Sequence, residues 1–319
     1  METTKQEYLQ NVLETHRMSH VQDLLDKYKS KRDEVKEAVK EKYNSDIYNP
    51  INSGSFAKYT AINSKFDLDI AIPFKRNSFN TLEDMLNGIF DFLTEKYEDE
   101  ATIRKQKVSI GIEFYPDDDD DIISLDIVPG RELNQDQYSD DKNINLFVNS
   151  KYGIFEEKTY IQTNIQAQID HIKAKENERM IIRLLKIWKT SNNEKYKSFL
   201  LELLTIKAFD KEDVSGDLWE KLKSVMQYIQ DNVTKDGFTL KDPGNSNNNV
   251  IETLETWERK NLSNQMERII NNIENADDNI KIYFPTNKDF EKDEESQNGY
   301  GIKGESNKYS IPPNNQRFG

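Results

Sequence analysis

Two aspartates separated by one residue are the first feature of this sequence that could do chemistry. The stretch at 52–70 reads NSGSFAKYTAINSKFDLDI, and Asp67 and Asp69 alternate there with apolar residues, as in a β-strand. Side chains two residues apart on a strand point to the same face. Adjacent carboxylates repel, and Mg²⁺, which favours carboxylate and phosphate oxygens, would relieve that repulsion. The pair therefore indicates a metal site, although surface charges on an edge strand would show the same spacing.

A third acid, Asp126, stands in the segment ISLDIVPG. Its neighbours Leu125, Ile127 and Val128 are apolar, so it interrupts a segment expected to be buried. A carboxylate in such a place is costly unless it has a partner. Three converging acids would form a platform for two metal ions, which stabilises the attacking and leaving oxygens of phosphoryl or nucleotidyl transfer.

The pair Gly54-Ser55 precedes these acids and favours a phosphate ligand. Glycine allows a close approach of backbone to phosphate. Ser55 adds a hydroxyl and an amide donor at an expected turn-to-helix junction, where anions bind well. A glycine turn, an Asp-X-Asp strand and a later strand with a single aspartate are together more specific than any one of them.

The second half of the chain contains two apolar helical segments with residues that could contact a nucleotide. In MIIRLLKIWK, Arg183 and Lys186 lie three residues apart and hence on one side of a helix. They could hold a triphosphate, or form salt bridges with core acids. In KSFLLELLTIKAF, Ser198 is an expected N-cap. Phe199 could stack on a nucleobase or pack in the core.

The elements that must position these residues follow from periodicity and capping signals. The first half is predicted to contain strands and the second half to be mainly helical. Ser19 and Gln22 form a capping-box pattern, and the acidic run 117–121 is expected to be a solvated hairpin loop. Helices are predicted within 5–43 and over 81–97, 164–175, 177–190, 198–210, 217–233 and 250–275, and strands over 66–74, 107–115, 121–129 and 144–148. From Pro285 the composition is too polar to order itself.

Composition narrows the class of protein. The 319 residues include no cysteine and three isolated histidines, which excludes a disulfide framework and disfavours a zinc site. No apolar run approaches the ~20 residues of a membrane span, and the first residues lack a signal-peptide core, so we expect a cytoplasmic protein without membrane association. The net charge of −14 disfavours binding of long nucleic acid. Small nucleotides carried with a metal ion remain compatible with it.

The motifs together resemble a known family. GSFAKYTAINSKFDLDIAIPF, followed by LDIVPG, is similar to the nucleotidyltransferase core of the DNA polymerase beta-like superfamily. More narrowly it resembles oligoadenylate synthases, cyclic GMP-AMP synthases and the bacterial CD-NTases of antiphage (CBASS) signalling. IIRLLKIWK, SFLLELLTIKAF and KDPGNSNNNV, the last with Asp242, Pro243 and Asn249, match further segments in the family's order. The resemblance covers residues 50–285.

The resemblance implies an α+β fold: a polymerase beta-like palm, in which helices flank a mixed sheet, and a C-terminal helical lobe, with the active site in the cleft between them. The corresponding domains are a nucleotidyltransferase core with long N-terminal helices (1–160), a helical lobe (161–284) and a flexible tail (285–319). The implied activity joins NTPs, ATP and/or GTP, into a cyclic di- or trinucleotide with release of pyrophosphate.

The resemblance also assigns residues. Two Mg²⁺ ions, or Mn²⁺, would bind Asp67, Asp69 and Asp126, which would also be catalytic. The nucleotide would contact six residues: Gly54, Ser55, Arg183, Lys186, Ser198 and Phe199. The animal enzymes of the family usually have tyrosine at the stacking position, so phenylalanine here keeps the ring and loses a hydroxyl contact.

The end of the chain and the choice of product leave alternatives. Bacterial relatives encoded beside ubiquitin-transfer-like proteins end in a small residue that is conjugated to other molecules, and Gly319 would fit that role with such a protein as partner. A terminal glycine is also common by chance. A downstream effector activated by the cyclic nucleotide is implied. The other functions are a linear-oligonucleotide synthase, a transferase that nucleotidylates a protein or small molecule, and a catalytically silent nucleotide-binding regulator.

Overall fold

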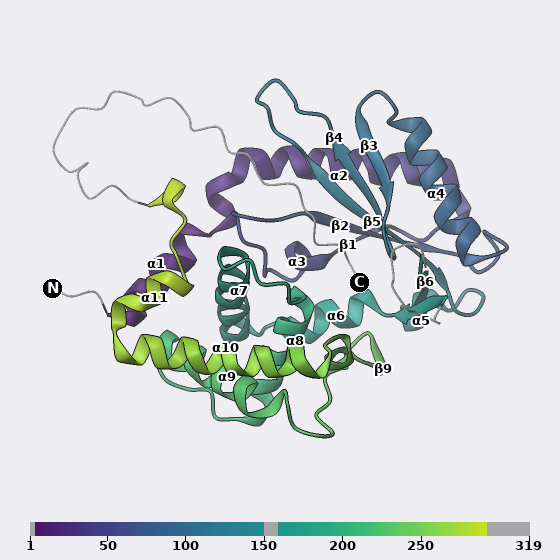
Figure 1. The fold of residues 1–319 in the computed structure, drawn as a ribbon. Coiled ribbons are helices and arrows are strands. Elements are labelled where there is room, and N and C mark those ends of the chain that lie inside the picture. The colour runs from purple at the N-terminus through teal and green to yellow at the C-terminus, as the bar shows by residue number, and fades with distance from the viewer. Residues whose placement is uncertain (1–3, 150–158, 292–319) are drawn as a thin grey trace.

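Strands with alternating apolar residues form one mixed sheet at the centre of the protein. The computed structural model describes residues 4–149 and 159–291 (Figure 1). The main path of the sheet is β1-β2-β5-β4-β3, and β6 pairs with β5 and β7 with β6. Only β2 and β5 pair in parallel. The strands are β1 (Ile51–Ser53), β2 (Leu68–Phe74), β3 (Ala101–Lys105), β4 (Ile110–Phe114), β5 (Ser124–Glu132), β6 (Ile144–Phe147) and β7 (Tyr160–Thr163).

Two helices cover one face of this sheet. The long α2 (Gln22–Tyr43) and the amphipathic α4 (Leu82–Lys96) pack on residues such as Leu68 and Ile70 of β2 and Ile127 of β5 (Figure 1). Side chains alternate along a strand, so the intervening residues point to the opposite face. That face, which carries Asp69 and Asp126, looks toward the helical part of the chain.

Six other helices form a second lobe around its own apolar core. Its helices are α1 (Lys5–Thr15), α7 (Glu176–Ser191), α8 (Ser198–Lys211), α9 (Leu218–Asn232), α10 (Thr256–Asn275) and the short α11 (Ile280–Tyr283). The helix α6 (Ile165–Ile172) and a small hairpin, β8 (Lys241–Asp242) and β9 (Asn245–Asn249), lie at its border with the sheet (Figure 1). Two short helices, α3 (Gly54–Ala57) and α5 (Tyr138–Asp141), complete the fold.

The predicted fold class, a mixed sheet flanked by helices with a C-terminal helical lobe, is confirmed. The helix expected from Thr81 begins there, and Thr81 and Asp84 form a reciprocal capping box. The acidic run 117–121 joins the antiparallel strands β4 and β5, as a hairpin loop should. The predicted capping box at Ser19 is wrong: Ser19 lies in a 3₁₀ turn (Met18–Val21) and α2 starts at Gln22 without a side-chain cap.

Two segments pack elsewhere than in their predicted domains. Helix α1 belongs to the helical lobe, because Leu9 and Val12 are buried in its core. Part of the expected tail is ordered: Asn287 donates from its backbone to Thr15 and from its side chain to Asn63, at the junction of α1 and α2. Gly319 lies outside the described residues. Within 4–149 and 159–291, no helix is long and apolar enough to cross a membrane.

Candidate active site

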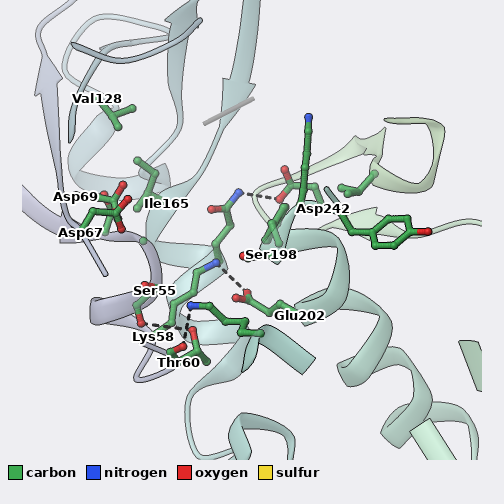
Figure 2. Close-up of a pocket in the computed structure, with 18 of the residues that line it drawn as sticks. Ser55, Lys58, Thr60, Asp67, Asp69, Val128, Ile165, Ser198, Glu202 and Asp242 are labelled. Atoms are coloured by element: carbon green, nitrogen blue, oxygen red, sulfur yellow. Dashed lines mark hydrogen bonds and ion pairs between the residues drawn. The ribbon is translucent and has the colours of Figure 1, made fainter. Parts of the chain in front are cut away.

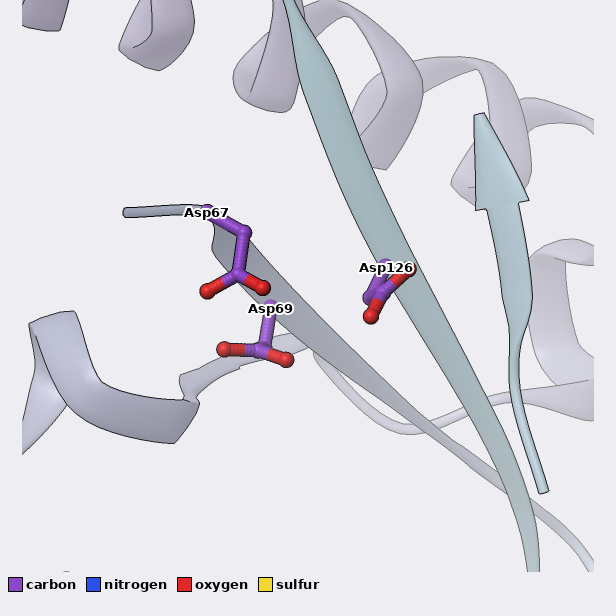
Figure 3. Close-up of side chains that lie close together, drawn as sticks. All are labelled: Asp67, Asp69 and Asp126. Atoms are coloured by element: carbon purple, nitrogen blue, oxygen red, sulfur yellow. The ribbon is translucent and has the colours of Figure 1, made fainter. Parts of the chain in front are cut away.

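Three carboxylates meet on the face of the sheet that looks toward the helical lobe. Asp69 of β2 and Asp126 of β5 are direct partners in the parallel register. Asp67 precedes β2, and its side chain lies beside them (Figure 3). One oxygen from each of the three lies within 4.8 Å of the others. We call Asp67, Asp69 and Asp126 the inner triad. The predicted convergence of these acids is therefore present.

Burial makes the inner triad electrostatically unfavourable without a cation. The exposed fractions of Asp69 and Asp126 are 2% and 8%. Burial, with the charge of Asp67, raises the pKa of Asp126 to about 7, and the same two causes raise the pKa of Asp69 well above its ordinary value. The Oδ1 atom of Asp69 is buried without a hydrogen-bond partner among the described residues. A cluster with unfavourable charge and an unpartnered acceptor has the donor set that suits Mg²⁺ or Mn²⁺.

The glycine before these acids is required by geometry. Gly54 has φ +66°, in the left-handed region that side chains disfavour. A Cβ atom at this position would lie 1.6 Å from Oδ2 of Asp69. Glycine therefore allows the backbone of the Gly-Ser turn to pass directly beside the inner triad. Ser55 follows in α3 and faces the same space (Figure 2).

A cavity of about 480 Å³ separates the sheet from the helical lobe, a volume typical of small-molecule sites. Figure 2 shows part of its lining, with Ser55, Asp67 and Asp69 on one side and Ser198 and Glu202 on the other. The predicted site residues that line the cavity are Gly54, Ser55, Asp67, Asp69, Lys186, Ser198 and Phe199. Asp126 belongs to the inner triad, but its side chain does not line the cavity.

Two lysines of α7 face the inner triad across the cavity. Lys186 Nζ donates to the carbonyl oxygen of Thr60 at 2.8 Å, and Lys189 Nζ donates to Ser198 Oγ at 3.2 Å. Burial lowers the pKa of each lysine to about 8, while the charge of Asp67 acts in the opposite direction on both. Two cations at the wall of a cavity could bind the negatively charged oxygens of a triphosphate.

Arg183 is not placed with these lysines. It does not line the cavity, and its Nε atom is buried without a partner among the described residues. Burial and the nearby charges of Arg17 and Arg179 lower the pKa of its guanidinium. Of the other basic residues of α7, Lys189 lines the cavity together with Lys186. The signal for it was present, because Lys189 follows Lys186 at the same three-residue spacing.

Phe199 lies where both of its predicted roles overlap. Its ring lines the cavity and also packs against the core of the helical lobe. Lys58 Nζ lies 4.6 Å from the ring centroid and forms a buried ion pair with Glu202 at 2.8 Å (Figure 2). Sequence reasoning missed Lys58 and Glu202, although both belong to segments that carry predicted site residues.

The β8–β9 hairpin closes one side of the cavity through Asp242. This buried carboxylate accepts hydrogen bonds from Gln168 Nε2 at 3.0 Å, Asn248 Nδ2 at 3.2 Å and the Gly244 amide at 2.8 Å (Figure 2). Asn249 Oδ1 accepts from the Leu240 amide. These contacts give Asp242 and Asn249 a structural role, which holds the hairpin against α6.

A second acidic group lies in the β4–β5 hairpin loop. Oxygens of Asp117, Asp119 and Asp121 lie within 4.8 Å of one another. We call these residues the outer triad. Lys27 Nζ contacts all three, at 2.7, 2.6 and 2.6 Å. A cation of the protein itself thus contacts every member of the outer triad and offsets part of its charge.

Comparisons with known proteins agree with this geometry. No family model matches the sequence. The cyclic AMP-AMP-AMP synthase of Escherichia coli MS 115-1 is 24% identical over 208 residues, which is 60% of this chain and 60% of that protein.

Solved structures cover more of the chain. CdnC of E. coli MS115-1 with ATP has a TM-score of 0.68 at 20% identity, over 89% of this chain and 94% of that one. The CD-NTase CdnG of Bradyrhizobium diazoefficiens with GTP has a TM-score of 0.66 at 12% identity, over 88% and 94%. The cyclic AMP-GMP synthase DncV of Vibrio cholerae has a TM-score of 0.55 at 14% identity, over 74% and 68%. The chain therefore has the fold of the bacterial CD-NTases.

Proposed function

We propose that this protein is a CD-NTase that makes a cyclic di- or trinucleotide second messenger from NTPs, with release of pyrophosphate, in bacterial antiphage (CBASS) signalling. The observation that carries the proposal is the inner triad: three clustered carboxylates, two of them buried, beside a cavity whose opposite wall presents Lys186 and Lys189. ATP and GTP are the favoured substrates, because CdnC and CdnG were solved with them.

In this proposal Asp67, Asp69 and Asp126 hold Mg²⁺, two ions by the family's pattern, or Mn²⁺ in its place. Bound there, the metal neutralises charge on the reacting phosphate and activates the attacking hydroxyl. The inner triad fits this role because burial and the charges of its neighbours raise the pKa of Asp69 and Asp126, and because Asp69 Oδ1 lacks a partner among the described residues.

The residues around the inner triad position the substrates. Gly54 and Ser55 lie beside the reacting phosphate, and Lys186 and Lys189 hold the triphosphate of the donor. Ser198 is kept near that triphosphate by Lys189. Phe199 stacks on the donor base. Arg183 was predicted as a phosphate contact; Lys189 lines the cavity and Arg183 does not, which makes Lys189 the better candidate.

The reaction joins an acceptor hydroxyl to the donor α-phosphate. Asp126 accepts the hydroxyl proton as the new oxygen–phosphorus bond forms. The bond from the α-phosphate to the bridging oxygen breaks, and pyrophosphate leaves with that electron pair. A second transfer, with the linear intermediate reversed in the cavity, closes the ring.

Product analysis tests the function. The purified protein is incubated with each labelled NTP and with mixtures, in Mg²⁺ or Mn²⁺, and then with phosphatase. A small product that resists phosphatase supports a cyclic nucleotide. A phosphatase-sensitive oligonucleotide indicates a linear synthase, a labelled protein or small molecule indicates a transferase, and bound but unreacted NTP under all conditions favours a regulator.

Nucleotide stacking on Phe199 has its own test. Phe199→Ala should weaken ATP binding by about tenfold, because base stacking contributes ~1–3 kcal/mol. Phe199→Tyr keeps the ring and should bind like the unaltered protein. Calorimetry with a non-hydrolysable analogue measures both. Equal affinities for the two variants would assign Phe199 to the core alone.

Conjugation through Gly319 remains a prediction, with a ubiquitin-transfer-like protein as the partner. Mass spectrometry of the protein from its native host, with neighbouring genes expressed, should detect a conjugate at Gly319, and only unmodified termini would count against it. A cyclic-nucleotide-activated effector is the proposed recipient of the product. It can be sought by binding the purified product to proteins encoded nearby.

A further inference from the structure

A buried glutamine holds one oxygen of the inner triad. Gln106 lies in the tight turn between β3 and β4 and is 4% exposed. Its Nε2 atom donates to Oδ1 of Asp126 at 2.8 Å. This contact comes from a segment that sequence reasoning did not connect with the site.

The orientation of the Gln106 amide is fixed by Ser109. Ser109 Oγ donates to the side-chain oxygen Oε1 of Gln106 at 3.1 Å. In the backbone of the same turn, the amide nitrogen of Gln106 donates to the carbonyl oxygen of Ser109 at 2.8 Å. A hydroxyl that donates to Oε1 leaves Nε2 to face the carboxylate. The reverse orientation would set two acceptors against each other, Oε1 and Oδ1 of Asp126.

A glycine makes room for this arrangement. Gly111 of β4 is the direct partner of Asp126 in the antiparallel register. A Cβ atom on Gly111 would lie 2.6 Å from Nε2 of Gln106, which is closer than real contacts of this kind. The glutamine therefore reaches Asp126 through space that any side chain at position 111 would occupy.

We propose that Gln106, oriented by Ser109, is a positioning residue for Asp126. It binds one carboxylate oxygen with a neutral donor and so sets the direction of the other oxygen toward Asp67 and Asp69. A neutral amide does this without competing with a metal ion for the charge of the triad. The inference rests on the proposed function, because it assumes that the inner triad binds a divalent cation. Outer-shell partners of this kind typically change metal affinity by about 10–100-fold.

Binding of Mn²⁺ to the full-length protein without nucleotide tests the inference. Free Mn²⁺ is measured by electron paramagnetic resonance during titration. Gln106→Leu should bind Mn²⁺ about tenfold more weakly, because the oxygen it releases can turn away from the triad. Gln106→Glu should also have an affinity for Mn²⁺ that differs from that of the unaltered protein, because a carboxylate would then face Asp126. Circular dichroism and thermal unfolding show whether each variant folds.

Two further variants make the result specific. Ser109→Ala removes only the group that orients the amide and should weaken Mn²⁺ binding a few-fold, which keeps the test available if Gln106→Leu does not fold. Gln22→Leu is the matched control: Gln22 Nε2 also donates to an aspartate, Asp26, at 2.7 Å, but on the exposed surface of α2. It should leave Mn²⁺ binding unchanged.

The outcomes separate the inference from the proposed function. A purely structural role would lower the melting temperature of Gln106→Leu or Ser109→Ala and leave Mn²⁺ affinity as in the unaltered protein, which overturns the positioning role. If Mn²⁺ binding survives Asp67→Asn with Asp69→Asn, or is absent in the unaltered protein, the metal site itself fails and both proposals fall.

Discussion

The described part of the chain contains two acidic triads, each close enough for its members to share a cation, and their surroundings are opposite. In both, carboxylate oxygens from three aspartates lie within 4.8 Å of one another. The outer triad is largely solvated, and Lys27 contacts all three of its members. The inner triad is mostly buried and faces a cavity, and the charges of Lys58 and Lys186 do not offset the rise in the pKa of Asp69.

The difference teaches that proximity of acids does not by itself specify a metal site. In the outer triad, water and Lys27 remove the repulsion, and hydrogen bonds from Lys27 and from loop amides lower the pKa of Asp117. In the inner triad, burial and mutual repulsion raise the pKa of Asp69 and Asp126. An opposite direction of pKa change in two similar clusters is a physical reason to assign cation binding to the inner one.

The largest expected effect comes from removing charge in the inner triad. Asp67→Asn with Asp69→Asn should lower the rate of pyrophosphate release on the order of 10³-fold or more, because the metal contributes several kcal/mol of transition-state stabilisation. Asp117→Asn with Asp119→Asn should retain the rate. A coupled pyrophosphate assay measures both. Comparable losses in the two double variants would erase the distinction between the triads.

Metal-dependent stability should also separate the triads, with a defined pH dependence. The pKa of Asp126 is raised to about 7 in the folded state, so without metal, stability is present at low pH and falls as pH rises from about 4 toward 7. The shift corresponds to a cost on the order of 4 kcal/mol. Mn²⁺ should therefore raise the melting temperature strongly at pH 7.5 and little at pH 5. Persistence of the effect in Asp67→Asn with Asp69→Asn would place the cation elsewhere.

Replacing Asp126 should stabilise the metal-free protein while it removes activity. Asp126→Asn keeps an oxygen that can accept from Gln106 and removes the buried charge. At pH 7.5 without metal, its melting temperature should rise by about 10 °C, since the cost is on the order of 4 kcal/mol and 1 kcal/mol corresponds to ~2–4 °C in a chain of this size class. At pH 5 the gain should be about a third as large, because most of the Asp126 side chain is still protonated in the folded state. Asp119→Asn, in the outer triad, should show no such gain, and calorimetry at both pH values compares them.

The smallest effect is expected from the cation of the outer triad. Lys27→Met removes the cation that contacts all three aspartates of the outer triad and should lower the melting temperature by about one or two degrees at low salt. Because exposed charges are screened, the difference should shrink in 1 M KCl. Nucleotidyl transfer should be unaffected. A large, salt-independent loss would mean that the Lys27 contacts stabilise the fold through packing.

The elements that carry the inner triad could be predicted because their signals are local. Period-two alternation located β2 and β5, and an acid between apolar residues singled out Asp126. Thr81 and the early acids of α4 marked its start. These features depend on neighbouring residues and on backbone geometry, which a single sequence carries directly.

Other features depend on tertiary packing and were missed. The spacing of Arg183, Lys186 and Lys189 gives two equivalent pairs, and only the rotation of α7 against the sheet decides which pair meets the cavity. The strand β9 (Asn245–Asn249) reads NSNNN and has no apolar periodicity, so its pairing with β8 left no signal. The contact from Gln106 to Asp126 depends on the register of β4 against β5.

The packing of α1 with the helical lobe has a mechanical consequence. Because α1 and α2 belong to different lobes, the chain passes between the lobes at 16–21 and again where β7 leads into α6. It crosses a third time after Phe284, which is buried in the helical lobe, since Phe290 packs against the core of the sheet. These crossings favour a hinge rotation of one lobe against the other. All three carboxylates lie on the sheet side of that hinge. Three candidate nucleotide contacts lie on the other side: Lys186, Lys189 and Phe199. Opening of the hinge would thus let a triphosphate enter, and closing would bring the lysines against it. The distances among the three carboxylates would stay constant during this motion.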